Sequence, residues 1–230
     1  MVRLLSGGAA KGVVLALADE FRARSGADID GEFTAVGALR DRVVAGEAAD
    51  VLILTQALIE DLTARGLLVA GSARPLGGVR TGVAIPAGHD APDISDNDSF
   101  ARALTGATAI YIPDPVLSTA GVFFMRVVGE LGVRDAIEPK LRAFPNGETA
   151  MRTMAERREK GSIGCTQMTE ILMTDGLVLL GPLPPDHDSS TIYMAAVTTG
   201  ARNPAEAHAL MQLVSASETA QLRRSKGYEV

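Results

Sequence analysis

Hydrophobic positions in the first third of the chain alternate between short apolar runs and stretches with helical periodicity. An apolar run at residues 2–5 precedes a small-residue turn and an amphipathic stretch that ends near Gly26. The same order of strand, turn and helix returns from residue 29 and again from residue 50. Such alternation favours a parallel sheet with right-handed crossovers, in which ligands bind beyond the carboxyl ends of the strands. The three turns are therefore expected to form one half of a binding site.

A strand-like run flanked by glycines at residues 79–86 interrupts this order, and we interpret it as a crossing between two lobes. The chain has 230 residues, more than the ~100–150 of a typical domain, which also favours two lobes. Further strands are expected at residues 109–112 and 162–167, each followed by polar residues, and a run at residues 192–197 returns the chain. The turns of the second lobe are expected to supply the other half of the site.

The strand-to-helix turns are rich in Ser, Thr, Gly and Ala, and each exposes backbone N–H groups at a helix N-terminus, where anions bind. For any one turn the alternative is that small residues only make a tight bend or cap the helix, as Ser118 or Thr119 is placed to do. The turns taken together are a more specific signal of anion binding than any single turn. The turn Ser6-Gly7-Gly8 lacks the spacing of a nucleotide-binding loop, which argues against nucleotides.

Composition narrows the class of partner. Only 4% of residues are aromatic, Trp is absent and the net charge is −6, so nucleic acid is not an expected partner. Every apolar run is shorter than the ~18 residues of a membrane-spanning helix, so membrane insertion is not expected. No basic leader with a hydrophobic run follows Met1. This predicts a cytoplasmic protein as the sequence stands, and a periplasmic one with a transporter partner if a signal peptide has been removed.

Two cations are candidates for holding a negatively charged ligand. Lys11, one turn into the first helix, either points toward the ligand or is solvated. Arg80 lies in the otherwise apolar crossing, where a guanidinium has little structural use. A ligand carboxylate would accept a bidentate pair of hydrogen bonds from it.

Catalytic chemistry has few candidates. The three histidines have no Cys, Asp or Glu at metal-ligand spacing, so neither a metal nor a cofactor is expected. Asp114, between two prolines, is a weak catalytic candidate, because Asp in such a position commonly stabilises a turn. Glu148 and Glu170 would act as a general base if buried near the ligand, and are otherwise helix-dipole partners or solvated. No acid-base pair is apparent, so the catalytic residues stay undefined.

Several motifs together carry a resemblance to a known family: Ser6-Gly7-Gly8-Ala9-Ala10, residues 45–53, Asp114-Pro115 with Ala120-Gly121, Ile163-Gly164, and residues 217–228. Over essentially its whole length the chain resembles the molybdate-binding-protein-like branch of the type II periplasmic solute-binding proteins. The resemblance implies an α/β fold of two lobes, each a mainly parallel sheet flanked by helices, with the ligand cleft between them. It implies lobe 1 at residues 1–81 and 194–230, lobe 2 at residues 82–193, and hinge crossings near 79–83 and 192–196.

Departures from the family pattern bear on the ligand. Where the family's molybdate binders contact the oxyanion with two serines, this chain has Ala9 and Val36, and Gln167 stands at the position of a tyrosine. Each lost hydroxyl removes a hydrogen bond that contributes about 0.5–3 kcal/mol. The resemblance therefore implies a substrate-binding protein for a small anion, with an organic carboxylate favoured over molybdate. The candidate ligand-binding residues are Ser6, Gly7, Gly8, Ala9, Lys11, Thr34, Val36, Thr55, Gln56, Arg80, Ser118, Thr119, Asn146, Thr166 and Gln167.

An enzyme is the alternative, because aconitate isomerase looks similar to this branch. Allylic isomerisation of an unsaturated polycarboxylate requires bound carboxylates and one positioned acid-base group. Arg80 or Lys11 would hold the carboxylates, and the acid-base group would come from the three weak candidates above. A third alternative is a cytoplasmic sensor that acts through a partner and exposes an apolar patch. The sequence sets no oligomeric state.

Overall fold

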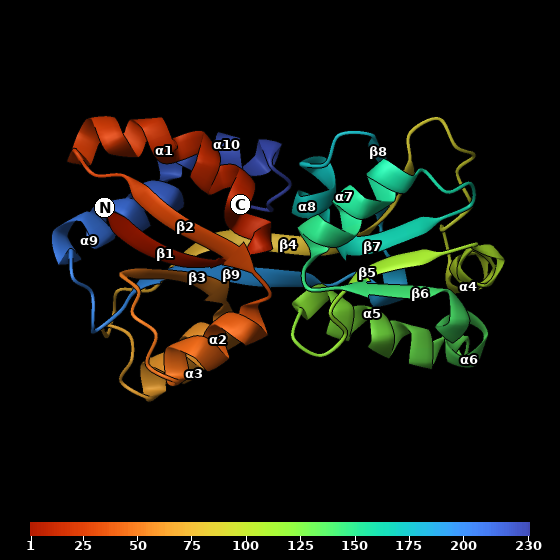
Figure 1. Ribbon diagram of the computed structural model, residues 1–230, viewed down its shortest axis with the longest axis horizontal. Helices are drawn as coiled ribbons and strands as arrows, with labels where there is room; N and C mark the ends of the chain where they lie inside the picture. Colours follow the sequence, from red (N-terminus) through yellow and green to blue (C-terminus); the bar gives the residue numbers. More distant parts are fainter. The chain divides into compact units, whose positions relative to one another are not determined.

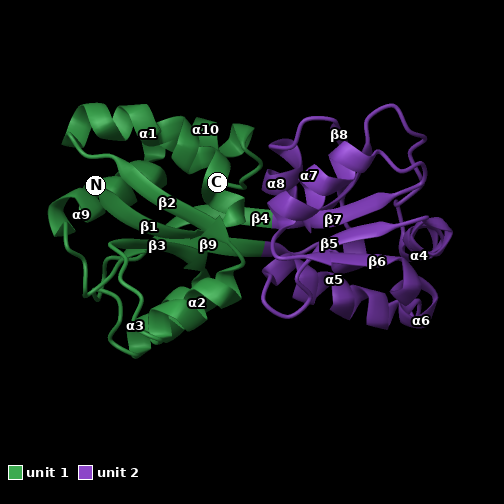
Figure 2. Cartoon of the chain, in the orientation of Figure 1, with its two compact units in different colours: residues 1–79, 191–230 green, residues 80–190 purple.

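The computed structural model describes residues 1–230, which divide into two units (Figure 2). Unit 1 comprises residues 1–79 and 191–230, and unit 2 comprises residues 80–190. The chain passes between the units within strand β4 (Arg74–Pro86) and again at the start of β9 (Ser190–Val197). The boundaries expected from the sequence were residues 81 and 194.

Unit 1 is built around a sheet with the strand order β2-β1-β3-β9 (Figure 1). β1 (Val2–Gly7) pairs in parallel with β2 (Ile29–Thr34) and β3 (Val51–Thr55), and β9 pairs antiparallel with β3. All five residues of β3 are buried, as expected for a strand covered on both faces. The helices of unit 1 are η1 (Gly8–Ala10), α1 (Lys11–Ser25), α2 (Val36–Val44), α3 (Gln56–Ala64), α9 (Pro204–Ser215), η4 (Ser217–Thr219) and α10 (Ala220–Ser225).

Unit 2 contains a sheet in which β8 (Leu177–Pro182), β4, β7 (Ile163–Gln167), β5 (Ile110–Pro113) and β6 (Leu141–Phe144) are neighbours in that order. β5 pairs in parallel with both β6 and β7, whereas β4 pairs antiparallel with β7 and β8. The helices are α4 (Asn97–Gly106), α5 (Thr119–Glu130), α6 (Arg134–Ile137), η2 (Glu138–Lys140), α7 (Gly147–Arg157), α8 (Met168–Leu172) and η3 (Pro185–His187). In Figure 1, α7 and α8 lie on one side of this sheet and α5 and α6 on the other.

The α/β fold class expected from the sequence is confirmed, with differences in single elements. β6 and α8 were not expected, because four and five residues are too short for a periodic pattern to emerge. α2 begins at Val36, two residues after β2 ends at Thr34. The first residues of α2 therefore belong to the connection that follows β2.

Strand periodicity divides the core of unit 2 between the two faces of its sheet. Ile110 and Ile112 of β5 pack with Phe124 of α5 on one face. Tyr111, between them, packs with Met151 of α7 on the other face, since successive strand residues point to opposite sides. Both faces of the sheet are therefore covered by helices. The ends of the strands lie outside this core and can serve other roles.

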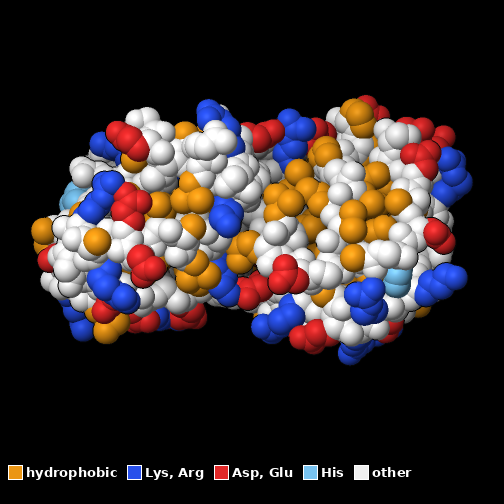
Figure 3. Space-filling view, turned by 90° about the horizontal axis from the view of Figure 1, so that it is seen from above, with side chains coloured by type: hydrophobic (Ala, Val, Ile, Leu, Met, Phe, Trp, Pro, Cys, Tyr) orange, Lys and Arg blue, Asp and Glu red, His pale blue; other side chains and the backbone are white.

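The surface of unit 2 carries an apolar area. Figure 3 shows hydrophobic side chains gathered on the face of unit 2 that carries α8 and β8. Leu172 of α8 and Val178 of β8 are among the exposed large hydrophobic residues.

None of the helices combines the length and the apolar character that a membrane span requires.

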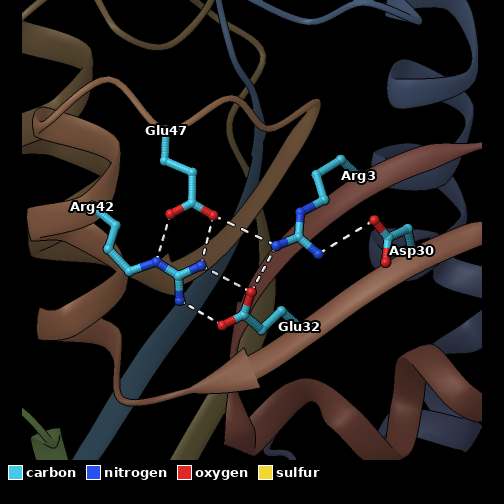
Figure 4. Close-up of polar contacts among 5 residues, drawn as sticks. All are labelled: Arg3, Asp30, Glu32, Arg42 and Glu47. Atoms are coloured by element: carbon cyan, nitrogen blue, oxygen red, sulfur yellow. Dashed lines mark hydrogen bonds and ion pairs between the residues drawn. The ribbon is translucent and has the colours of Figure 1, made fainter.

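An ion-pair cluster ties strands β1 and β2 of unit 1 to α2 and the loop that follows it (Figure 4). Glu32 of β2 pairs with Arg3 of β1 at 2.7 Å and with Arg42 of α2. Arg42 also binds Glu47 at 2.6 Å, and Arg3 reaches Asp30. The hydrogen bond from Arg42, followed by that from Arg3, lowers the pKa of Glu32 to about 2. The cluster therefore holds the loop after α2 against the sheet with Glu32 ionised.

Replacing Glu32 by Gln is expected to destabilise the protein by about 1 kcal/mol, because more than a third of the side chain stays in solvent. The pKa of Glu32 is lowered on folding, so its contribution is present above pH 4.5 and is lost as the pH falls toward 2. Urea unfolding at pH 7 and pH 3 measures the effect. Glu20→Gln, which removes a surface pair with Arg24 on α1, is the matched control. Equal losses for both variants at pH 7 would contradict the prediction.

Candidate functional site

The turns that follow β1, β2 and β3 meet at one edge of the unit 1 sheet, because parallel strands end at the same edge. Gly7 lies opposite Thr34 in the register of β1 and β2. A Cβ atom on Gly7 would lie 2.7 Å from Val36 Cγ1 and 3.1 Å from Tyr193 Cε1. We call residues 6–11, 34–36 and 55–56 the unit 1 half-site.

The helices of the unit 1 half-site begin without side-chain caps. The N-cap residues of η1, α2 and α3 are Gly7, Ala35 and Thr55, and none accepts a hydrogen bond from its helix through a side chain. By contrast, α4 in unit 2 begins at a side-chain cap, in which Asp96 accepts from the Ser99 amide at 2.7 Å. First-turn amides without a side-chain partner suit an anion, and the helix dipole adds to the attraction.

Several side chains expected in the unit 1 half-site are committed elsewhere. Ser6 is fully buried, and its hydroxyl donates to the carbonyl oxygen of Gly7 at 2.9 Å. Gln56 is exposed and donates through Nε2 to Glu60 at 2.7 Å. The Lys11 ammonium lies 5.9 Å from the centroid of the Phe33 ring. Backbone amides are therefore the main polar groups at this edge.

Four further expected residues line the same edge with different chemistry. Ala9 and Val36 are buried and offer only methyl groups. Thr34 is half-buried at the end of β2, and Thr55 is buried at the end of β3. These two threonines are the hydroxyl side chains that the half-site retains besides Ser6.

In unit 2 the parallel strands β5, β6 and β7 likewise end at one edge, where α5, α7 and α8 begin. A Cβ atom on Gly147, the first residue of α7, would lie 2.0 Å from Glu170 Oε2 and 2.1 Å from Thr166 Oγ1. Thr166 Oγ1 donates to Glu170 Oε2 at 2.6 Å. The starts of α7 and α8 therefore meet around one carboxyl group. We call residues 118–119, 146–148 and 166–170 the unit 2 half-site.

Glu170 is a buried carboxyl group with an altered affinity for protons. Burial raises its pKa to about 7, and the charge of Glu148 acts in the same direction. Hydrogen bonds from Thr166 and from the backbone amides of Gln167 and Glu148 act the opposite way, but burial outweighs them. A carboxyl group with this pKa exchanges a proton near neutral pH.

Gln167 ends β7 and precedes α8, and its side chain is 3% exposed. Its Oε1 and Nε2 atoms are both buried without a hydrogen-bond partner, and it does not cap α8. The hydroxyl of Thr169, two residues on, is likewise buried and unpartnered. Buried polar groups in proteins are nearly always paired, so this cluster of unpaired atoms calls for an explanation.

The remaining candidates of unit 2 serve local structure or pair within the unit. Asp114 Oδ1 accepts from the amides of Val116 and Leu117, both at 2.8 Å, and so stabilises a turn. Asn146 caps α7 by accepting from the Thr149 amide at 2.8 Å. For Asp114 this is the turn-stabilising role that we weighed against catalysis, whereas the capping role of Asn146 was not expected.

In unit 2 the start of α5 and the partner of Arg80 differ from what we expected. α5 begins at Thr119 with Ser118 as its N-cap, yet no side chain caps it, so its first amides stay open. Arg80, expected to meet a ligand, binds Asp188 at 2.7 Å in the same unit.

Sequence reasoning missed Tyr193, Asp188 and Thr169. Tyr193 belongs to β9 and reaches the unit 1 half-site from 186 positions away in the chain from Gly7. Its only signal was its rarity, since the chain has 3 tyrosines. Asp188 gave no local signal for its pairing with Arg80. No group of three or more His, Cys, Asp or Glu side chains is placed to hold a metal ion.

Two α/β units joined by two crossings, each with helix N-termini at one sheet edge, define the class of periplasmic-binding-protein-like folds. The family model described as bacterial extracellular solute-binding protein matches residues 2–229, and the chain belongs to this family. Aconitate isomerase from Pseudomonas sp is 25% identical, over 97% of this chain and 86% of that protein. Molybdate-binding protein ModA from Escherichia coli is 21% identical, over 93% and 83%. The periplasmic molybdate-binding protein of Azotobacter vinelandii superposes with a TM-score of 0.82 at 18% identity, covering 100% of this chain and 99% of that one.

Replacing Gly147 by Ala is expected to destabilise the protein by about 1–3 kcal/mol, because the new methyl group would overlap the Glu170 carboxyl and the Thr166 hydroxyl. Gly129→Ala in α5 is the matched control. Nothing lies within 4 Å of the added Cβ there, and the change should stabilise the helix by about 0.5–1 kcal/mol. Chemical denaturation of both variants measures the difference. A Gly147→Ala protein as stable as the parent would show that Glu170 does not hold the position described.

Proposed function

We propose that this protein is a substrate-binding protein for a small anion, and that the anion is an organic carboxylate rather than a molybdate-type oxyanion. The observation that carries the proposal is the set of helix N-termini without side-chain caps at the edge of the unit 1 sheet. Such amides bind anions without a cationic side chain. This accords with a chain whose net charge is −6.

The preference for a carboxylate rests on what the half-sites lack and what they offer. Ala9 and Val36 provide no hydroxyl to a tetrahedral oxyanion. Gln167 provides an amide in place of a phenol. Two relatives carry molybdate in their names and one carries aconitate, a tricarboxylate. The amide and the absent hydroxyls favour the second chemistry for this chain.

We also propose that, if the chain is exported, it acts in the periplasm with a transporter of the ABC type as its partner. The family to which the chain belongs is described as extracellular. The proposal predicts no nucleic-acid partner, since the chain is acidic and poor in aromatic residues.

Thermal-shift measurements test the ligand class. Molybdate, tungstate, sulfate and phosphate are compared with di- and tricarboxylates at equal concentration. A ligand that binds only the folded protein raises its stability by about 2.7 kcal/mol at a hundred times its Kd. We expect at least one carboxylate to raise the melting temperature and molybdate to leave it unchanged. A response to molybdate alone would overturn the carboxylate assignment.

A second candidate function is isomerisation of an unsaturated polycarboxylate, and Glu170 is the observation that favours it. A general base works best when its pKa lies near the working pH, and burial brings the pKa of Glu170 to about 7. In an allylic shift the base removes a proton from one carbon, the double bond moves, and a proton is returned at the far carbon. One proton is removed and one is returned, so atoms and electrons balance and the step needs no cofactor.

Proton NMR of any carboxylate hit, followed over time, tests this candidate. If the protein is an isomerase, the spectrum converts to that of a double-bond isomer, and Glu170→Gln lowers the rate by about 10²–10⁴-fold. The rate should rise with pH through about 7, because only the ionised carboxylate accepts a proton. Glu156→Gln, at an exposed position of α7, is the matched control and should leave the rate unchanged. An unchanged spectrum would leave binding as the function.

A further inference from the structure

The amide of Gln167 sets a chemical condition that its partner must meet. An amide group has an oxygen that accepts and a nitrogen that donates hydrogen bonds. Both atoms are buried in unit 2 and neither has a partner in the protein. A partner that satisfies the whole group must therefore donate to Oε1 and accept from Nε2.

The neighbouring polar groups of the unit 2 half-site do not meet this condition. The Thr166 hydroxyl donates to Glu170, and the Asn146 oxygen accepts from α7. The Thr169 hydroxyl is itself buried and unpartnered, which adds a third unsatisfied atom to the same short segment. The chain has thus placed both donor and acceptor capacity at the edge where β7 ends, without using either.

A fully ionised oxyanion meets only half of the condition. Molybdate, sulfate and simple carboxylates present acceptors alone at neutral pH, so they pair with Nε2 and leave Oε1 buried without a donor. An unpaired buried acceptor weakens binding by roughly tenfold to a hundredfold. A hydroxyl group both donates and accepts, so a carboxylate that carries one offers a partner to both Oε1 and Nε2.

We infer that Gln167 is a specificity-determining residue that selects a hydroxyl-bearing carboxylate over its deoxy analogue and over acceptor-only oxyanions. This inference rests on the proposed binding of a carboxylate at the half-sites. It adds that the ligand carries a hydroxyl group, which contacts Gln167 through both ends of the amide.

Three pairs of ligands that differ by one hydroxyl test the inference in the unmodified protein. L-Malate and D-malate are compared with succinate, and citrate with propane-1,2,3-tricarboxylate, by isothermal titration calorimetry at pH 7.5. We expect the hydroxylated member of at least one pair to bind about ten to a hundred times more tightly. Equal affinities within every pair that binds would overturn the inference, because a bound water would then satisfy Gln167, while leaving the proposed function intact.

The variant Gln167→Met removes the amide and keeps the length of the side chain. It should reduce the preference for the hydroxylated ligand to near onefold, because that ligand loses its bonds to both amide atoms whereas the deoxy ligand loses only its bond to Nε2. Gln212→Met, at an exposed position of α9, is the matched control and should keep the preference. A preference that survives in Gln167→Met would assign it to another residue and overturn the inference. Binding of none of these carboxylates, with molybdate bound instead, would overturn the proposed function and the inference together.

Discussion

The parallel pairing of three strands in each unit is the constraint on which the rest of the structure depends. Parallel strands end at one edge, so the helices that follow begin there, with their first-turn amides at that edge. The antiparallel strands β4 and β9 carry the two crossings. The positions of the helix N-termini follow from this pairing, since a single change of strand direction would move a helix N-terminus to the opposite edge.

The two half-sites use the same edge in different ways. In unit 1 the polar groups are mainly amides, because Ser6 and Gln56 bond within the protein and Ala9 and Val36 are apolar. In unit 2 the α7 N-terminus already has partners, since Asn146 and Glu170 bind its first amides. Buried side chains, rather than amides alone, are therefore the groups that we propose for recognition there. General anion affinity and chemical selectivity can thus reside in different parts of the chain.

Much of this arrangement could be predicted from the sequence, because local patterns encode it. The three strand-turn-helix repeats of unit 1 follow from the periodicity of hydrophobic positions. The partners of candidate side chains could not be predicted. Arg80 and Asp188 are separated by 108 positions, and only the folded sheet of unit 2 brings them together. The same holds for Tyr193, which approaches Gly7 only after β9 has paired with β3.

The short helix α8 shows why burial and function are linked in this protein. Five residues give little helical stability of their own, yet the segment from Thr166 to Glu170 buries a carboxyl group, an amide and two hydroxyls. The Thr166–Glu170 bond and the backbone amides satisfy part of this set, and Gln167 and Thr169 stay unpaired. Apolar residues in place of Gln167 and Thr169 would avoid the cost of burying unpaired polar atoms. Their polar character is therefore better explained by a partner that arrives after folding than by the stability of unit 2 itself.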